Sequence, residues 1–154
     1  MVVDACDSDP DKIKPMSEQT PTPIPDLDSA AYWEAAHRHE FLLQRCSSCE
    51  KFRFYPRSHC PYCFSASFEW QRASGRGTVY SFTIIHKAPS PGFRDKVPYV
   101  LALIDLFEGV RMMTNIIDCE PNDVEIGMPV EIVFQDLTDT ISLPQFRPAQ
   151  PQKI

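Results

Sequence analysis

The segment from Cys46 to Cys63, which reads Cys-Ser-Ser-Cys-Glu-Lys-Phe-Arg-Phe-Tyr-Pro-Arg-Ser-His-Cys-Pro-Tyr-Cys, decides the fold of this chain. Two Cys-x-x-Cys pairs stand in it, separated by ten residues. One such pair also suits a redox motif, whereas two close pairs supply the four thiolates of a closed tetrahedral zinc site. We therefore expect a small zinc ribbon with one Zn²⁺ per chain, and the alternative metal is iron in a centre of rubredoxin type. The predicted ligands are Cys46, Cys49, Cys60 and Cys63.

The residues between the two pairs fit a metal centre. Four thiolates on a dication leave a formal charge of −2, which nearby cations can offset. Aromatic side chains in the same stretch are expected to form an apolar shell that keeps solvent from the thiolates. The candidate cations are Lys51, Arg53, Arg57 and His59, and the candidate shell is Phe52, Phe54, Tyr55 and Phe64.

The charge of the chain is unevenly distributed. The 154 residues carry a net charge of −6, yet residues 41–100 hold nine Lys and Arg against three Asp and Glu, a local balance of +6. The overall acidity argues against nucleic acid as the partner. The chain shows no signal-peptide pattern and no apolar run of about 18 residues, so we expect a cytoplasmic protein without a membrane span.

The segments before the ribbon have a different composition. Residues 1–25 are rich in proline and polar residues, which predicts a disordered tail or an arm that wraps a partner. Residues 26–40 are expected to form a docking helix capped by Asp28, with Ala30, Trp33, His37 and Phe41 on one face. The helix docks either on its own domain or on a partner subunit. If the helix docks on a partner subunit, the candidate interface residues are Tyr32, Trp33 and His37.

The rest of the chain is predicted to consist mainly of β-strands. Residues 41–73 are expected to form the zinc ribbon, with a strand on each side of the cysteines, and residues 147–154 a C-terminal tail. Residues 74–146 contain five β-rich runs separated by glycine-marked bends, at 78–85, 99–107, 110–117, 127–134 and 141–146. The predicted fold is therefore mainly β, with an N-terminal helix, a rubredoxin-like zinc ribbon and a five-stranded OB-fold barrel.

One loop of the predicted barrel is longer than a hairpin needs. It runs over residues 86–96, and long loops on rigid scaffolds often carry binding residues. Lys87, Arg94 and Lys96 supply positive charge for phosphates, and Phe93 supplies an aromatic ring. A solvated loop without a ligand is the alternative.

The ordered combination of these motifs resembles the DUF35 family. The resemblance covers residues 26–146 and rests on the Trp-bearing helix, the cysteine ribbon, Trp70, the block from Ser74 to Tyr80, Pro98-Tyr99-Val100 and Ile126-Gly127-Met128. It implies a rubredoxin-like zinc ribbon joined to an OB-fold domain that helps to hold a coenzyme A thioester. It also implies a subunit that accompanies a thiolase-like enzyme, an aldolase or a hydratase. Glu50 departs from the pattern, since the family usually has glycine there.

We therefore expect a non-catalytic subunit in a hetero-oligomer with a thiolase-like partner, with acyl-CoA as the ligand of Lys87, Phe93, Arg94 and Lys96. The catalytic residues would belong to the partner. A dyad of Cys119 and His86 is the only nucleophile and base pair that the sequence leaves open. The alternative functions are a nucleic-acid-binding module, because OB folds and zinc ribbons both serve that role, and a rubredoxin-like electron carrier.

Overall fold

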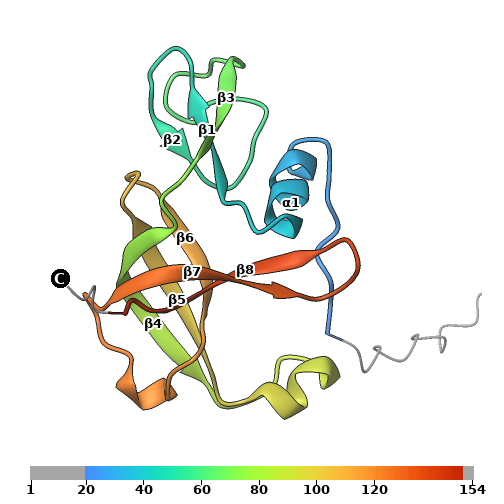
Figure 1. The fold of residues 1–154 in the computed structure, drawn as a ribbon, viewed down its shortest axis with the longest axis vertical. Coiled ribbons are helices and arrows are strands. Elements are labelled where there is room, and N and C mark those ends of the chain that lie inside the picture. The colour runs from blue at the N-terminus through green and yellow to red at the C-terminus, as the bar shows by residue number, and fades with distance from the viewer. Residues whose placement is uncertain (1–19, 151–154) are drawn as a thin grey trace, which may run out of the picture.

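The chain folds into two stacked β units with one helix, α1 (Ala30–His37), beside their junction (Figure 1). The computed structural model describes residues 20–150, so most of the predicted N-terminal tail and the last four residues of the predicted C-terminal tail lie outside the described residues. Within residues 20–150, no helix is long and apolar enough to cross a membrane.

The smaller unit is a three-stranded antiparallel sheet that carries the cysteines. Its strands are β1 (Leu42–Cys46), β2 (Phe52–Arg53) and β3 (Phe68–Arg72), in the order β2-β1-β3. Leu42 pairs with Arg72 and Cys46 with Phe68, so β1 brings the first cysteine to the end of the sheet that lies farthest from the link between β3 and β4. The predicted ribbon is thus confirmed.

The larger unit is a closed five-stranded barrel. Its strands follow the order β4-β5-β6-β8-β7, and β6 and β8 form its one parallel pair, at Ile116 and Phe146. The strands are β4 (Arg76–Ile85), β5 (Tyr99–Leu106), β6 (Arg111–Ile116), β7 (Pro129–Asp136) and β8 (Ser142–Pro148). Along β5 every second side chain is buried, which is the alternation that a barrel wall requires. The predicted OB-type barrel is confirmed.

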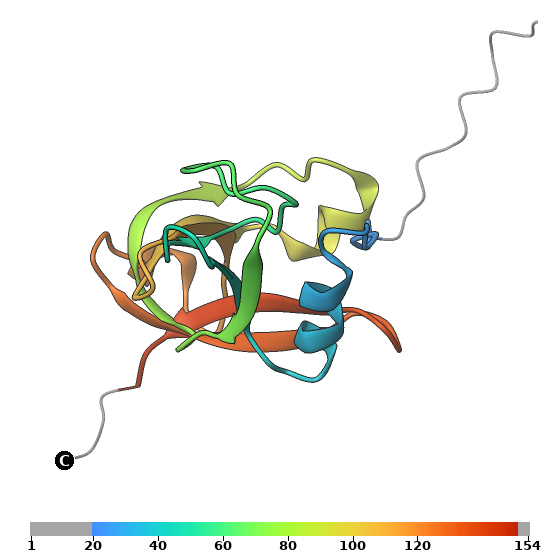
Figure 2. The same ribbon diagram turned by 90° about the horizontal axis from the view of Figure 1, so that it is seen from above.

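Two short 3-10 helices lie outside the barrel wall. The predicted loop of residues 86–96 contains the first, η1 (Pro91–Lys96), and η2 (Pro121–Asp123) follows β6. Viewed from above, η1 and the segment before α1 lie on the same side of the barrel (Figure 2). The Thr20 hydroxyl donates to the Gly92 carbonyl at 2.9 Å, which ties this segment to η1.

The start of the helix differs from the prediction. Asp28 makes no cap, because α1 begins at Ala30 and Ser29 occupies the cap position. The Asp26 carboxylate instead accepts the Ser29 backbone N–H at 2.8 Å, and the hydrogen bonds from Ser29 lower the pKa of Asp26. The turn before the helix is therefore fixed by Asp26, three residues before Ser29.

The helix docks on its own chain, which was one of the two alternatives, while contact of Tyr32 and Trp33 with a partner stays a prediction. Tyr32 is 2% exposed and Trp33 is 8% exposed. The Tyr32 ring packs edge-on against Phe41 and Phe54, and the Trp33 indole N–H donates to the Tyr55 hydroxyl at 3.1 Å. An amphipathic helix buries its largest aromatics on the nearest apolar surface, and here the ribbon and barrel supply it. His37 is exposed, so its role at an interface stays a prediction.

Gly77 lies where β4 passes closest to β5, and we expect a side chain there to destabilise the barrel. A Cβ at this position would lie 2.5 Å from the Asp105 carbonyl oxygen and 2.8 Å from Ile104 Cγ2. Gly77→Ala should lower the free energy of unfolding by about 1–3 kcal/mol in urea denaturation, because the backbone must move. Gly109→Asn is the control, since Gly109 has φ +82° and open space around it, and it should cost less than about 1 kcal/mol. Equal losses in the two variants would contradict this account.

Candidate metal centre and adjoining pockets

The four cysteines lie on two knuckles of equal geometry. The Glu50 N–H donates to the Cys46 carbonyl at 3.0 Å, and the Phe64 N–H donates to the Cys60 carbonyl at 2.9 Å. Glu50 and Phe64 both have φ 60°, the left-handed conformation in which glycine is favoured. This explains why glycine is usual at the position of Glu50. The first knuckle forms with glutamate at this position. Phe64 occupies the equivalent position of the second knuckle and has the same left-handed backbone conformation.

The thiol positions match a tetrahedral zinc site. All four sulfur atoms lie within 4.8 Å of one another, and the Cys46–Cys63 and Cys49–Cys60 sulfur pairs are each 3.6 Å apart. A tetrahedron with Zn–S bonds of about 2.3 Å has sulfur–sulfur edges of about 3.8 Å. A disulfide would need about 2.05 Å, and the cysteines are unpaired. The structure therefore brings the four predicted ligands together in a geometry that fits the metal.

The thiols are poised for metal binding but do not ionise together. The backbone N–H of Cys49 is the main cause that lowers the pKa of Cys46. Burial opposes ionisation of Cys60, yet the N–H groups of Tyr62 and Cys63 and the neighbouring thiols lower its pKa to about 6. At Cys63 the N–H of Ser65 lowers the pKa, but burial and the other three thiols outweigh it and raise the value to about 11. Four thiolates without a cation are too costly, so metal binding releases at least one proton near neutral pH.

Arg53 is a buried cation in the same ribbon and is 2% exposed. Its Nε donates to Gln44 Oε1 at 2.6 Å, its Nη2 donates to the Arg57 carbonyl at 2.8 Å, and its guanidinium lies over the Phe68 ring. Within the described residues, Nη1 has no hydrogen-bond partner and no carboxylate pairs with Arg53. A buried cation is costly unless charge compensates it, and a tetrathiolate zinc centre of charge −2 in the same unit supplies that charge. The other candidate cations, Lys51, Arg57 and His59, are exposed.

The expected aromatic shell is wrong for Phe64 and stays a prediction for the other three residues. Phe52 and Phe54 pack against the core cluster, whereas Phe64 is 80% exposed and Tyr55 packs on Tyr32 and Trp33. Phe64 cannot shield the thiolates because its left-handed backbone at the end of the knuckle leaves its ring in solvent. Cys63 is accordingly exposed, while Cys46 and Cys60 are buried.

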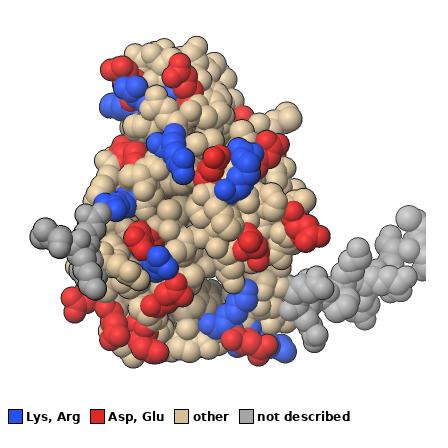
Figure 3. Space-filling view, viewed as in Figure 1, with Lys and Arg blue, Asp and Glu red and all other residues tan. Residues whose placement is uncertain are grey.

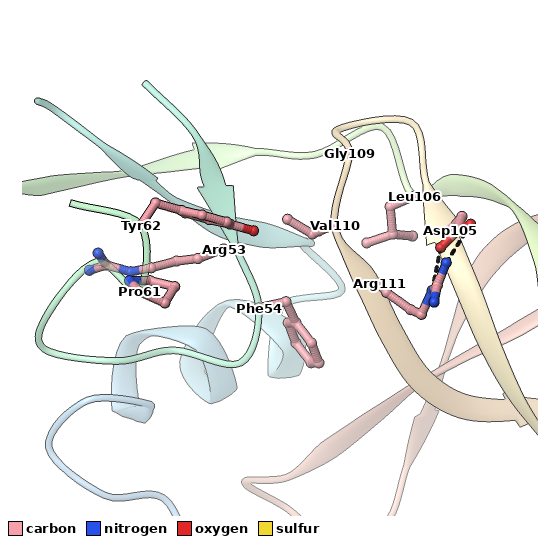
Figure 4. A pocket seen from close by; sticks show the side chains of 9 residues that line it. All are labelled: Arg53, Phe54, Pro61, Tyr62, Asp105, Leu106, Gly109, Val110 and Arg111. Carbon is pink, nitrogen blue, oxygen red and sulfur yellow. Dashed lines mark hydrogen bonds and ion pairs between the residues drawn. The ribbon is translucent and has the colours of Figure 1, made fainter. Parts of the chain in front are cut away.

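A cleft of about 600 Å³ separates the ribbon from the β5–β6 hairpin (Figure 4). Figure 4 shows Arg53, Pro61 and Tyr62 on the ribbon side and Asp105 and Arg111 on the barrel side. Arg111 donates from Nε to Asp105 Oδ1 at 2.6 Å and from Nη2 to Oδ2 at 3.1 Å, and this contact lowers the pKa of Asp105. The charges on the barrel side are therefore satisfied by each other.

A second pocket, of about 390 Å³, lies beside η1, and we call it the η1 pocket. Two of the predicted CoA-binding residues, Phe93 and Lys96, line it, and the Lys96 ammonium lies 5.6 Å from the centre of the Phe93 ring. Lys87 and Arg94 are exposed and do not line it. The other lining residues come from the N-terminal segment and the barrel: Thr20, Pro21, Pro23, Tyr99, Asn115, Ile116, Ile117, Gln135, Leu137, Leu143 and Gln145.

Gln145 is the residue of this pocket that sequence reasoning missed. It is 6% exposed, and its Oε1 is buried without a hydrogen-bond partner in residues 20–150. An unpaired buried acceptor costs about 1–3 kcal/mol, so such atoms are uncommon unless a ligand or water completes them. The only sequence signal was a glutamine inside the predicted fifth strand.

The postulated dyad of Cys119 and His86 does not form. Within residues 20–150, Cys119 has no hydrogen-bond partner, and so none with His86. Burial, followed by the charges of Asp123, Asp118 and Glu120, raises the pKa of Cys119. A thiol kept protonated and without a base is a poor nucleophile.

Basic side chains do not form one continuous patch on the face shown in Figure 3. On the face shown in Figure 3, Lys and Arg side chains are interspersed with Asp and Glu. Within residues 41–100, Arg45 pairs with Glu50, and farther along the chain Arg111 pairs with Asp105. This face lacks the continuous positive stripe that a nucleic-acid backbone requires.

Two family models match consecutive parts of the chain. The ChsH2 rubredoxin-like zinc ribbon domain matches residues 33–69, and the ChsH2 C-terminal OB-fold domain matches residues 70–135. The division between the two matches falls within β3, and the second match ends before β8, the last strand of the barrel.

Relatives and a solved structure extend these matches. A probable enoyl-CoA hydratase alpha subunit of Thermomonospora curvata is 40% identical over 133 residues, 86% of this chain, but the chain spans only 41% of that protein. A DUF35 domain-containing scaffold protein of Methanocaldococcus jannaschii is 43% identical over 103 residues, which is 66% of this chain and 72% of that protein. The solved structure described as Ltp2-ChsH2(DUF35) aldolase matches with a TM-score of 0.74 and 39% identity, over 82% of this chain and 98% of the matched chain. This chain therefore belongs to the DUF35 family, with a rubredoxin-like zinc ribbon followed by an OB-fold domain.

Proposed function

We propose that this chain is the zinc-containing, non-catalytic subunit of a cytoplasmic acyl-CoA-processing complex, in which it holds the coenzyme A thioester for a catalytic partner. The observation that carries the proposal is the η1 pocket, a largely apolar cavity that Gln145 lines and that has Lys96 at its wall. Gln145 Oε1 is buried and has no hydrogen-bond partner in residues 20–150. Such a pocket suits a ligand that is mostly apolar, bears an N–H group and ends in an anion.

Coenzyme A has these features in the required order. Its pantetheine arm is a slender chain whose amide groups can form hydrogen bonds with the Gln145 side chain, which lines the pocket. Its phosphates suit the Lys96 ammonium, and Arg94, which is exposed on the same short helix, adds a second positive charge. Lys87 lies outside the pocket lining and would contribute only to the surrounding field. Binding at this remote handle positions the reacting carbon for the partner.

The metal has a structural role in this proposal. With four cysteine ligands, Zn²⁺ has no open position for water or substrate, and it contributes folding free energy to the ribbon. The ribbon in turn supports Phe54 and Tyr55, which pack on Tyr32 of α1. The metal therefore holds the junction of ribbon, helix and barrel together.

One serine–histidine–aspartate cluster among the described residues lacks the arrangement of a catalytic triad. Ser142, His37 and Asp136 lie together, but the Ser142 hydroxyl is fully buried and donates to the Asp136 carboxylate, while His37 Nδ1 is 3.4 Å from the same hydroxyl. In a catalytic triad the histidine would take that proton and the aspartate would orient the histidine. Here the carboxylate also accepts from His39 at 2.9 Å, so the cluster joins the end of α1 to the barrel.

We place the partner among thiolase-like or aldolase enzymes, which make or break a carbon–carbon bond beside the thioester. The match to the aldolase structure covers 98% of the matched chain, so nearly all of that chain has a counterpart in this protein. The match to the hydratase subunit leaves most of that protein uncovered, so it gives weaker support for a hydratase as the partner of this chain.

Capture of the partner tests the proposal. The untagged protein that co-purifies with this chain from its native host should be an acyl-CoA enzyme with its own nucleophile or base, and the pair should turn over a thioester while this chain alone does not. Turnover of a thioester by the purified chain alone would overturn the proposal. Binding of oligonucleotides that weakens steeply with salt, without affinity for coenzyme A, would favour a nucleic-acid module.

A further inference from the structure

An apolar groove adjoins the η1 pocket, and we call it the junction groove because it lies where α1, the ribbon and the barrel meet. Its volume is about 390 Å³. Asn115 and Leu143 line both the groove and the η1 pocket, so the two cavities are neighbours on the barrel. Its further lining is Tyr32, Trp33, Phe54, Tyr55, Leu101, Met112, Met113, Thr114 and Pro144.

Three hydrogen bonds occupy polar side chains of the junction groove. The Trp33 indole N–H donates to the Tyr55 hydroxyl, the Thr114 hydroxyl donates to the Pro144 carbonyl, and the Asn115 amide donates to the Val100 carbonyl. The groove therefore offers aromatic rings and thioether or hydrocarbon side chains to an occupant. Met113, which is 64% exposed at its rim, is the kind of adaptable side chain that fits apolar ligands of different shape.

The two cavities differ in the chemistry that they accept. The η1 pocket is lined by a lysine and by the amide side chains of Asn115, Gln135 and Gln145, whereas the junction groove has no cation and is lined mostly by aromatic and aliphatic side chains. A single ligand that spans both needs an amide-bearing, anionic half and a hydrocarbon half, joined near Asn115 and Leu143. A coenzyme A thioester of a large apolar acid has this division.

We infer that the junction groove receives the acyl group of the thioester, so that this subunit selects large apolar acyl-CoA over acetyl-CoA. The inference rests on the proposed function, because the η1 pocket must hold the coenzyme A arm. Each methylene buried in the groove would tighten binding about fourfold. This subunit would then contribute to the choice of substrate by acyl size, although the reaction itself takes place on the partner.

Calorimetry on the full zinc-loaded chain tests the inference with free coenzyme A, acetyl-CoA and octanoyl-CoA. Octanoyl-CoA should bind at least about tenfold more tightly than acetyl-CoA. Met113→Glu places a carboxylate at the rim of the groove and should remove this difference while the affinity for free coenzyme A stays unchanged. Ile126→Glu is the matched control, since Ile126 is 73% exposed and lines neither cavity.

The outcomes separate the two proposals. If free coenzyme A and both thioesters bind with equal affinity, the acyl group lies elsewhere, and the inference is overturned while the proposed function stands. If no coenzyme A species binds, both are overturned. If Met113→Glu leaves the preference for octanoyl-CoA intact, or instead abolishes assembly with the partner, the groove is a protein contact or is unused, and the inference fails.

Discussion

Replacing Cys46 with serine should abolish zinc binding and unfold the ribbon. Cys46 is 1% exposed, and its sulfur lies 3.6 Å from that of Cys63, so serine removes a buried ligand that no other side chain can replace. Structural zinc contributes on the order of 10 kcal/mol in small domains, more than a three-stranded sheet of this size supplies by itself. Zinc content by mass spectrometry should fall well below one ion per chain, and residues 42–72 should lose protection from hydrogen exchange.

The control for this prediction is Cys119→Ser, which removes a cysteine outside the metal centre. It should leave the zinc content and the ribbon unchanged. Assembly with the partner should fail in the Cys46 variant, because α1 packs on Phe54 and Tyr55 of the ribbon. A Cys46→Ser protein that kept one zinc ion and full assembly would show that the metal is incidental.

Removing the two polar contacts of the η1 pocket should weaken coenzyme A binding by about a hundredfold. Lys96→Ala deletes a charged contact and Gln145→Leu deletes an amide contact, and each is worth about tenfold when the ligand bonds to the group. The loss from Lys96→Ala should shrink at high salt, because Lys96 is exposed. Calorimetric dissociation constants for the single and double variants provide the measurement.

Gln145→Leu also has an expected effect on stability. Because Gln145 Oε1 is buried and unpaired, leucine of similar volume should leave the ligand-free protein as stable or more stable in urea denaturation. Weaker binding together with unchanged or higher stability is the signature of a residue retained for a ligand. Lys51→Ala, which changes an exposed lysine of the ribbon, should affect neither quantity. A Gln145→Leu variant that bound coenzyme A normally would remove the main support for the η1 pocket.

Local sequence patterns predicted most of the architecture. The cysteine knuckles are contained in two four-residue segments, and their spacing alone brings each pair onto one turn. The barrel strands were predicted because β-rich runs alternate with glycine-marked bends, and β5 shows the resulting alternation of buried and exposed side chains. Even the departure at Glu50 proved local, since only its backbone conformation was in question.

One error is local, since Asp26 and not Asp28 bonds to Ser29 at the start of the helix. Other features depend on distant segments, because nothing in residues 26–40 reveals that Tyr55 lies against Trp33. Phe64 seemed a shield for the metal because sequence proximity does not give the direction of a side chain on a left-handed turn. Lys87 seemed equivalent to Lys96, yet only Lys96 lines a cavity.

The amino-acid sequence by itself determined that this protein has a four-cysteine ribbon and a five-stranded barrel, because ligand spacing and side-chain alternation are properties of neighbouring residues. Only the tertiary structure decided that α1 is buried against its own chain and that Gln145 has an unpaired acceptor beside Phe93 and Lys96. The physical reason is that burial and hydrogen-bond satisfaction depend on which strands meet when the barrel closes, and Gln145 lies about 50 positions from η1 along the chain.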